Sequence, residues 1–193
     1  PRPGDKKGRP DDGKPWLALY EAVMRAGVER GDVSALEMFQ ASVRRAPNAA
    51  IIRYFDATIT LSQLDEQSDA FAVALSESGV AKGDRLALVL QNIPQFIIAT
   101  VAAWKLGAVV VPINPMYRER EISTVLADSG AIGVICLESG AQMVRAAMTD
   151  TEVRTIITTS ELQFQTLMDP RIFASTERTR VEGTADMVEL IEQ

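Results

Sequence analysis

The feature that most constrains the fold of this chain is a regular alternation of apolar and helical segments between residues 85 and 158. Four short, largely apolar runs are LALVL, AVVVP, IGVICL and VRTIIT. Helices are expected between them: one opening near Pro94, one over residues 119–128 and one over residues 141–148. Continuous rather than alternating apolar runs are typical of parallel strands covered by helices on both faces. The sequence therefore predicts an α/β fold with a doubly wound, mainly parallel sheet, flanking helices and right-handed crossovers.

A small N-terminal region precedes this alternation. Residues 1–15 are polar and carry Lys and Arg side chains, so they are expected to be a disordered basic tail, and residues 16–28 can form a short helix. A better helix is predicted over residues 34–46, because Ser34 and Glu37 stand at capping-box spacing and a proline follows. Its apolar side chains are expected to face the core: Leu36, Phe39 and Val43.

A hairpin and a longer helix are predicted next. The runs IIRYF and TIT are expected to be two short strands separated by Asp56 and Ala57, a weaker turn signal than Asp-Gly. Thr60 and Gln63 form a second capping box, and a helix face then follows at steps of three and four residues. The residues on this face are Leu61, Leu64, Ser68, Phe71 and Leu75. The helix is expected to end near Gly79.

The last segment, residues 162–193, has weak periodicity and several charged or small residues. This composition favours a connector or a poorly packed end. Three regions are therefore predicted: the basic tail over residues 1–15, an N-terminal α/β unit over residues 16–160, and a connector over residues 161–193.

Composition excludes several classes of function. The formal net charge is -6 and no long block of one sign occurs, so nucleic acid is not an expected partner. The absence of histidine excludes Ser-His-Asp and Cys-His catalysis and every zinc site that needs an imidazole. The single cysteine, Cys136, allows no disulfide within the chain, which favours a cytoplasmic location. Inside its apolar run this thiol is expected to fill the core rather than act as a nucleophile.

A membrane-spanning segment is not predicted. The longest apolar stretch, residues 96–113, contains Lys105, Gly107 and Pro112, so it is interpreted as a helix, a turn and a strand. The basic tail does not resemble a secretory signal, because no apolar run follows it. Its cations are diluted by aspartates, so contact with a membrane surface is only a weakly supported hypothesis.

Ligands of doubly wound sheets bind beyond the carboxyl ends of the strands. The corresponding loops here are residues 91–94, 113–117, 138–140 and 158–160. Asn92 and Asn114 lie on this rim, where capping or turn formation is the favoured role and ligand binding the alternative. Trp104 and Met116 could line a hydrophobic channel, although packing is the commoner role of such side chains.

Other polar patterns carry less functional information. Neither glycine-rich phosphate-binding motif occurs, and the glycines of residues 79–84 precede a strand, so they are interpreted as a turn. Asp65, Glu66 and Asp69 stand at helical spacing and are expected on a solvated helix face rather than in an acid–base site.

Three segments resemble the adenylate-forming enzymes, the family of acyl-CoA synthetases, luciferases and peptide-synthetase adenylation domains. The stretch that begins ITLSQLDEQ and includes GVAKGDR is similar to the family's opening region, and WKLGAVVVPINP is its most diagnostic piece. The following EISTVLADSGAIGVICLE is similar to the family's next helix and strand. The resemblance covers residues 34–159, and VVVPINPMYRERE looks more like fatty-acid and medium-chain acyl-CoA ligases than amino-acid-activating domains. As a whole the chain most resembles the N-terminal part of a long-chain fatty-acid–CoA ligase.

The resemblance implies a parent enzyme that uses ATP and Mg²⁺ to convert a carboxylic acid into an acyl-adenylate and then transfers the acyl group to coenzyme A. It also implies that this chain is an N-terminal fragment that is inactive alone, binds no cofactor by itself, and supplies part of the acyl pocket wall. The family's phosphate-holding loop, ribose-binding aspartate and C-terminal lysine are absent. No catalytic, cofactor-binding or metal-ligating residue is therefore assigned.

Three alternatives stay open on the sequence alone. A fatty acyl-AMP ligase or a carrier-protein-directed enzyme would keep the adenylation step and change the acceptor. A stand-alone α/β unit could bind a ligand by itself. An interaction module would use an uncovered apolar face to bind a partner or a second copy of itself.

Overall fold

The computed structural model describes residues 32–167, 169, 171–173 and 177–193. The chain divides into two units, Pro1–Ser34 and Ala35–Gln193, and every element below lies in the second. The predicted basic tail over residues 1–15 and the predicted helix over residues 16–28 lie outside the described residues.

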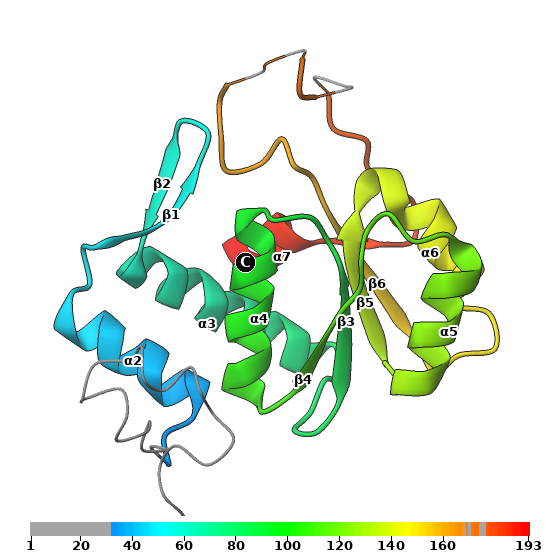
Figure 1. The fold of residues 1–193 in the computed structure, drawn as a ribbon, viewed down its shortest axis with the longest axis horizontal. Coiled ribbons are helices and arrows are strands. Elements are labelled where there is room, and N and C mark those ends of the chain that lie inside the picture. The colour runs from blue at the N-terminus through cyan, green and yellow to red at the C-terminus, as the bar shows by residue number, and fades with distance from the viewer. Residues whose placement is uncertain (1–31, 168, 170, 174–176) are drawn as a thin grey trace, which may run out of the picture. The chain divides into compact units, whose positions relative to one another are not determined.

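A parallel sheet forms the centre of the second unit (Figure 1). Its strands stand in the order β4, β3, β5, β6, β7, and each neighbouring pair is parallel. Their bounds are Val109–Pro112 for β4, Arg85–Val89 for β3, Gly133–Leu137 for β5, Thr155–Thr159 for β6 and Ala185–Asp186 for β7. The predicted α/β fold with a doubly wound parallel sheet is confirmed.

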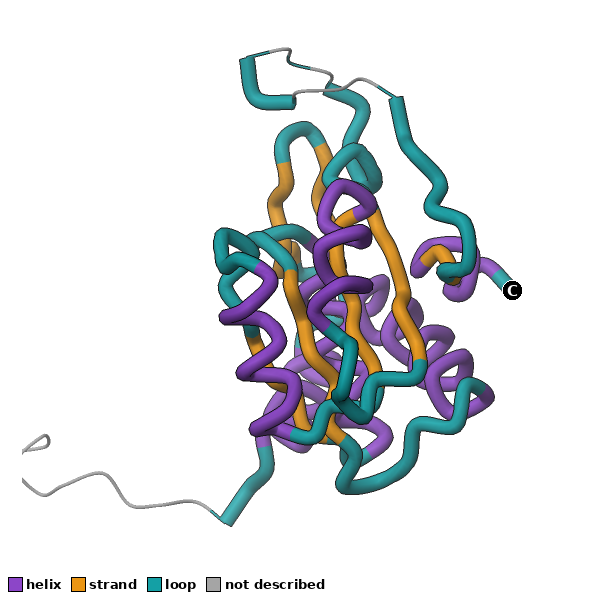
Figure 2. The backbone as a smooth tube through the Cα atoms, turned by 90° about the vertical axis from the view of Figure 1, so that its right-hand side faces the viewer, coloured by secondary structure: helices purple, strands orange, loops and turns teal. Residues whose placement is uncertain are grey.

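Helices cover both faces of this sheet (Figures 1 and 2). One face carries α3 (Leu61–Glu77), α4 (Pro94–Leu106) and the short α7 (Met187–Glu192), and the other carries α5 (Glu119–Ser129) and α6 (Ala141–Ala147). Successive strand residues point to opposite faces, so Leu86 and Leu88 pack toward α3 and α4 whereas Ala87 and Val89 pack toward α5 and α6. Burial on both faces explains why the strands are continuous apolar runs.

Local signals set the ends of the two central helices. The Thr60 side chain accepts from the Gln63 amide at 3.2 Å and the Gln63 side chain accepts from the Thr60 amide at 2.9 Å, as predicted. Helix α3 ends at Glu77, and Gly79 follows with φ 90°. Pro94 opens α4, whose last turn closes on Gly107 at φ 70°, a conformation that favours glycine.

Helix α2 (Ala35–Arg45) forms where predicted, but its apolar side is not fully buried. The prediction that Leu36, Phe39 and Val43 face the core is correct only in part, because all three are half-buried. Phe39 packs against the core cluster, whereas Leu36 and Val43 line an open groove. The helix thus covers the outside of α3 and α4 instead of entering the core.

The predicted hairpin is confirmed, with a different turn. Strands β1 (Ala50–Tyr54) and β2 (Ala57–Thr60) are antiparallel, and Tyr54 pairs with Ala57. The turn residues are therefore Phe55 and Asp56, one position earlier than predicted, and Phe55 adopts φ 52°. Tertiary contacts favour this turn: the Phe55 ring lies 5.1 Å from that of Phe173, and Asp56 accepts from an amide of the segment after β6.

The end of the chain differs from the predicted poorly packed segment. Residues Ala185–Asp186 add β7 to the sheet beside β6, and α7 follows with Met187 fully buried against α3. Weak sequence periodicity concealed this packing, because a two-residue strand and a six-residue helix are too short to show a period.

Candidate functional site

The carboxyl edge of the sheet contains its topological switch point. After β3 the chain crosses to β4 on one side, and after β4 it returns to β5 on the other side of β3. In such sheets a crevice forms beyond the carboxyl ends of the two strands that flank the reversal. These ends are followed here by residues 90–93 and by the 3₁₀ turn Glu138–Gly140. The parallel topology brings the four predicted loops to this one edge, with Thr158 and Thr159 inside β6 rather than after it.

Gln95 joins the start of α4 to the end of β6 at this edge. Its side chain is fully buried, and Nε2 donates to Thr159 Oγ1 at 3.0 Å and to the Ser160 carbonyl at 2.8 Å. Within the described residues its Oε1 has no hydrogen-bond partner. Burying an amide oxygen without a hydrogen-bond partner costs free energy, so this oxygen is a candidate functional group. Sequence reasoning missed this residue, since a glutamine after an N-terminal proline of a helix carries no local signal.

A charged cluster stands beyond β5 and β7. Arg178 Nη2 lies 2.7 Å from Glu138 Oε1 and also pairs with the Asp186 carboxylate. The Glu138 and Asp186 side chains are only 7% and 6% exposed, so both depend on this guanidinium for compensation. Burial by itself lowers the pKa of Arg178, but the hydrogen bonds that its guanidinium donates to both carboxylates outweigh burial and raise the pKa above its ordinary value. The Thr179 amide completes the cluster by donating to Glu138 Oε2 at 3.0 Å.

Further hydrogen bonds extend this cluster into a network. Asp186 Oδ1 caps α7 by accepting from the Val188 and Glu189 amides at 3.0 and 3.1 Å. Gln163 Oε1 accepts from Thr159 Oγ1 at 2.7 Å, and the Thr158 and Thr184 hydroxyls are 3.0 Å apart. Residues far apart in the chain are thus held together at the carboxyl ends of β5, β6 and β7.

Clefts border this network. One of about 170 Å³ is lined by Glu138, Ser139, Ser160 and Thr179, among others. A wider one of about 450 Å³ lies between residues 162–165 and α7, with Arg178, Arg180 and Asp186 in its wall. The walls offer guanidinium, hydroxyl and carboxylate groups, which suits binding of a polar ligand or of a further polypeptide segment. They include no cysteine or lysine positioned for nucleophilic attack.

The predicted rim residues have modest roles. Asn114 Oδ1 accepts from the Met116 amide at 2.9 Å, which confirms turn formation at this position. Asn92 is exposed after β3. The Met116 side chain is exposed, and Trp104 is exposed by about one third, so the prediction that both are packed is wrong for Met116. A channel-lining role for either residue stays a prediction.

As predicted, the Glu66 and Asp69 carboxylates of α3 lie on a solvated face, whereas the Asp65 side chain is only 32% exposed. Lys105 Nζ on α4 lies 2.7 Å from Asp65 Oδ1 and 2.6 Å from Asp69 Oδ1. Glu66 accepts from Ser62 at 3.1 Å one turn away. The sequence did not predict the lysine partner, which is present because α4 packs beside α3 and places its last-turn Lys105 between the two aspartates. This ion pair closes one wall of the groove beside α2 and has a structural role.

Other predicted exclusions concern the cysteine, metals and membranes. Cys136 is buried in β5, and burial raises the pKa of its thiol to about 12, which confirms its place in the core. No group of three or more acidic or thiol side chains comes together over the described ranges in a way that could hold a metal ion. None of the helices in that part of the chain combines the length and the apolar character needed to traverse a bilayer.

Comparison with known sequences gives a consistent result. The sequence profile of a family described as "AMP-binding enzyme" matches residues 39–186. A long-chain-fatty-acid–CoA ligase of Yersinia pestis is 36% identical over 149 residues, which make up 76% of this chain and 26% of that protein. The chain thus spans only about a quarter of the length of the curated relatives it matches.

Comparison with solved structures agrees on the fold. The anthranilate CoA ligase AuaEII in complex with anthranoyl-AMP has a TM-score of 0.70 over 83% of this chain and 28% of its own, at 17% identity. The N-terminal subdomain of Klebsiella oxytoca NpsA in complex with anthranilyl-AMSN is 32% identical, with a TM-score of 0.51 over 53% of this chain and 27% of its own. At 17% identity, the likeness to the anthranilate CoA ligase concerns the fold alone. At 32% identity, the likeness to the NpsA subdomain also concerns the sequence.

Proposed function

The chain belongs to the AMP-binding enzyme family, and on that premise we propose that it is the N-terminal part of an ATP-dependent ligase that joins a fatty acid to coenzyme A. The observation that carries this proposal is the 36% identity, over 149 residues, to a relative named for that reaction. The parent enzyme would use ATP and Mg²⁺ to form an acyl-adenylate and pyrophosphate. Coenzyme A would then accept the acyl group as a thioester.

The role proposed for this chain is positioning rather than bond making. Its carboxyl edge is held by the Arg178 cluster and by Gln95, so it presents a firm wall beside the clefts. A firm wall orients an acyl substrate and lowers the entropic part of the barrier. In this proposal residues 16–160 are the α/β subdomain, and residues 161–193 add β7 and α7 to it before they lead toward the central adenylate-binding domain of the parent.

The described residues do not fit Mg²⁺ or a triphosphate. Glu138 and Asp186, the buried carboxylates of the edge, are both paired with Arg178, which leaves neither charge for a metal ion. The turn of residues 79–84 leads into β3 rather than into a helix, so its amides form no helix N-terminus for phosphate. We therefore assign the binding of both groups to other parts of the parent enzyme, and predict that this chain alone does not form the adenylate.

Two experiments test the proposal. In the gene, the codons after that for Gln193 should encode a Thr/Ser/Gly-rich loop ending in Lys-Gly, and an immediate stop codon would contradict the proposal. In ATP–pyrophosphate exchange, the parent protein should respond to added fatty acid while this chain alone should not. Exchange by the isolated chain would refute the proposed positioning role.

A second proposal keeps adenylation but changes the acid and the acceptor. The NpsA likeness supports it, because that subdomain is 32% identical and was solved with an anthranilyl adenylate analogue. The parent would then stop at the adenylate or transfer to a carrier protein. Mass spectrometry of parent reactions with fatty or aromatic acids, coenzyme A and a phosphopantetheinylated carrier distinguishes the proposals by the product formed.

A third proposal concerns self-association of this chain. Large apolar side chains on α3, α4 and β4 are exposed by 37 to 59%: Val73, Ile97, Trp104 and Val109. Such residues favour contact with a further domain or a second copy. Light scattering over increasing concentration should detect dimers or larger species, and a constant monomer mass at high concentration would contradict self-association. The buried lone thiol is compatible with the cytoplasmic location that we propose for the parent.

A further inference from the structure

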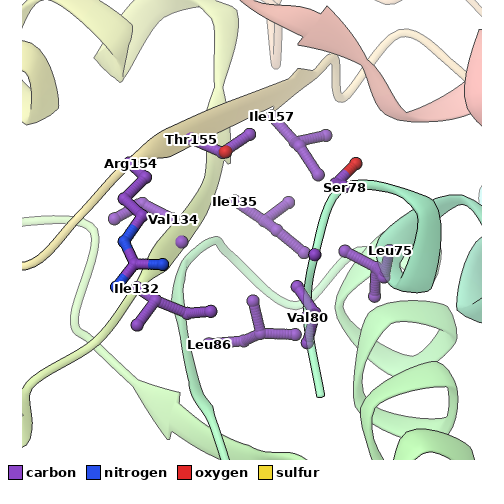
Figure 3. A pocket seen from close by; sticks show the side chains of 12 residues that line it. Leu75, Ser78, Val80, Leu86, Ile132, Val134, Ile135, Arg154, Thr155 and Ile157 are labelled. Carbon is purple, nitrogen blue, oxygen red and sulfur yellow. The ribbon is translucent and has the colours of Figure 1, made fainter.

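An apolar cavity lies at the amino edge of the sheet, opposite to the candidate site (Figure 3). Its volume is about 70 Å³. The last turn of α3, the turn after it, and the first residues of β3, β5 and β6 form its walls. The apolar side chains that line it are Leu75, Val80, Leu86, Ile132, Val134, Ile135 and Ile157.

Two local features leave this space unfilled. Helix α3 ends at Glu77, and Gly79 at φ 90° turns the chain toward β3, so no further helical turn covers the strand starts. Strand β5 begins with Gly133, where a Cβ atom would lie only 3.1 Å from Leu86 Cδ2. Because Gly133 has no side chain, the strand start contributes backbone rather than bulk to the cavity wall.

Three polar side chains line this apolar space. The Ser78 hydroxyl donates to the Ala74 carbonyl at 2.9 Å, so it is already paired. Arg154 and Thr155 line it at the start of β6, and Figure 3 shows the Arg154 side chain reaching down beside Ile132. Among the described residues, neither the guanidinium of Arg154 nor the hydroxyl of Thr155 has a side-chain hydrogen bond or an ion pair. The neighbouring acid, Glu152, is instead within 3.9 Å of Arg85. An exposed cation and a half-buried hydroxyl, neither with a side-chain partner in the described part of the chain, thus flank an apolar cavity.

This combination selects one class of ligand. Apolar walls give water few partners, and a retained water needs two to four hydrogen bonds. A guanidinium prefers a carboxylate, which it binds with two parallel hydrogen bonds. The cavity has about half the volume of the roughly 150 Å³ engineered cavity that binds benzene, so it has room for only a short, slim hydrocarbon chain.

We propose that this cavity binds a small monocarboxylate, with a tail of about three or four carbons between α3 and β5 and its carboxylate on Arg154 and Thr155. The site lies at the opposite edge of the sheet from the clefts assigned to the acyl substrate. It is therefore a second binding site, and it does not depend on the proposed ligase function.

The test uses this chain and sodium pentanoate as the probe, followed by shifts of backbone amide resonances. Binding is expected in the millimolar range, about the affinity that so few atoms support, with the largest shifts at Gly79, Val80 and Thr155. Pentanol, which keeps the tail but lacks the charge, should bind more weakly. An equal affinity for pentanol would contradict the role of Arg154.

Three variants locate the site. Arg154→Gln should weaken pentanoate binding by at least about threefold, the scale of a partly exposed ion pair, and leave pentanol binding unchanged. Ile132→Phe should weaken both ligands by filling the mouth, with folding checked by thermal unfolding. Arg120→Gln, which changes an exposed arginine on α5, is the matched control and should change the affinity for neither ligand.

Two outcomes would overturn the proposal. One is amide shifts confined to residues 91–92, 138–139 and 160, and the other is an unchanged pentanoate affinity in Arg154→Gln.

Discussion

The carboxyl edge and the amino edge of the sheet differ in the side chains that they bring together. At the carboxyl edge, buried polar side chains are joined to one another: Gln95 to β6, and Arg178 to Glu138 and Asp186. At the amino edge, the turns before β3, β4 and β5 each contain a glycine at positive φ, and an apolar cavity stands beside Arg154, which has no ion-pair partner in the described structure. The two edges thus differ in the burial of their polar links. Buried side chains are paired at the carboxyl edge, whereas the amino edge is linked by the half-buried Arg85, whose guanidinium donates to the Ser129 and Gly130 carbonyls.

The largest expected effect is the loss of Arg178. Arg178→Met leaves the Glu138 and Asp186 carboxylates buried without their partner, and we expect it to lower the free energy of unfolding by about 3 kcal/mol. Urea unfolding at pH 7 measures this loss. Arg120→Met on α5 is the control and should stay within about 0.5 kcal/mol. If the two variants were equally stable, the carboxyl edge would not depend on polar pairing.

The buried amide of Gln95 gives the next effect. Gln95→Ala removes hydrogen bonds to Thr159 and Ser160 and leaves a cavity, so a loss of about 2 kcal/mol is expected. Gln95→Leu should lose only about 1 kcal/mol, because it fills most of the volume and removes the unpartnered Oε1. Urea unfolding compares the two, and a greater loss for leucine would show that Oε1 is satisfied in solution.

A pair of glycines contrasts the two edges directly. Gly130 precedes β5 at the amino edge with φ 59°, and an added Cβ would lie 2.7 Å from Arg85 Nη2. Gly130→Ala is therefore expected to cost about 1.5 kcal/mol. Gly140, at the carboxyl edge, has φ -93° and open space around it, so Gly140→Ala should change stability by less than about 0.5 kcal/mol. Thermal unfolding of both variants measures this difference in stability. Equal losses of stability would contradict the contrast between the two edges.

The smallest effect concerns the hairpin and its link to the carboxyl edge. Tyr54 donates to the Glu161 carbonyl at 2.9 Å, and burial, followed by the Glu161 carboxylate, raises the pKa of Tyr54 to about 12. Tyr54→Phe should cost less than about 1 kcal/mol at pH 8, since the site is half-exposed.

The pH dependence of this effect has a definite sign. The folded state holds the phenol proton more tightly than the unfolded state, so the contribution of Tyr54 is complete below pH 10 and declines as the pH rises toward about 12. Unfolding of the native chain and of Tyr54→Phe from pH 8 to 11.5 should therefore give converging stabilities. A difference that grew with pH would contradict the raised pKa.

Much of the fold could be predicted, because its signals are local. The parallel strands follow from apolar runs, the start of α3 from Thr60 and Gln63, and its end from Gly79. The hairpin turn shifted by one residue, because Phe55 packs on Phe173, more than a hundred positions later. The α/β framework therefore depends on neighbours in sequence, and its outer details depend on neighbours in space.

The candidate site could be predicted only as a location. The rule for doubly wound sheets identified its four loops, but it did not identify Gln95 or Arg178. Gln95 meets Ser160 across 65 positions and Arg178 meets Glu138 across 40, so no window of sequence contains both partners. Both residues are polar, and their roles depend on burial that the pattern alone does not reveal.

Four properties follow from the sequence without a structure: the order of elements, the two-sided burial of the strands, the caps of the main helix and the family resemblance. Each depends on periodicity or on residues a few positions apart. Three others required the folded structure: which charges are paired, the packing of β7 and α7 at the end of the chain, and the cavity beside Arg154. These features depend on the packing of segments that are distant in sequence. Once such a segment buries a polar side chain, that side chain must find a hydrogen-bond or ion-pair partner, because an unpaired buried group costs free energy.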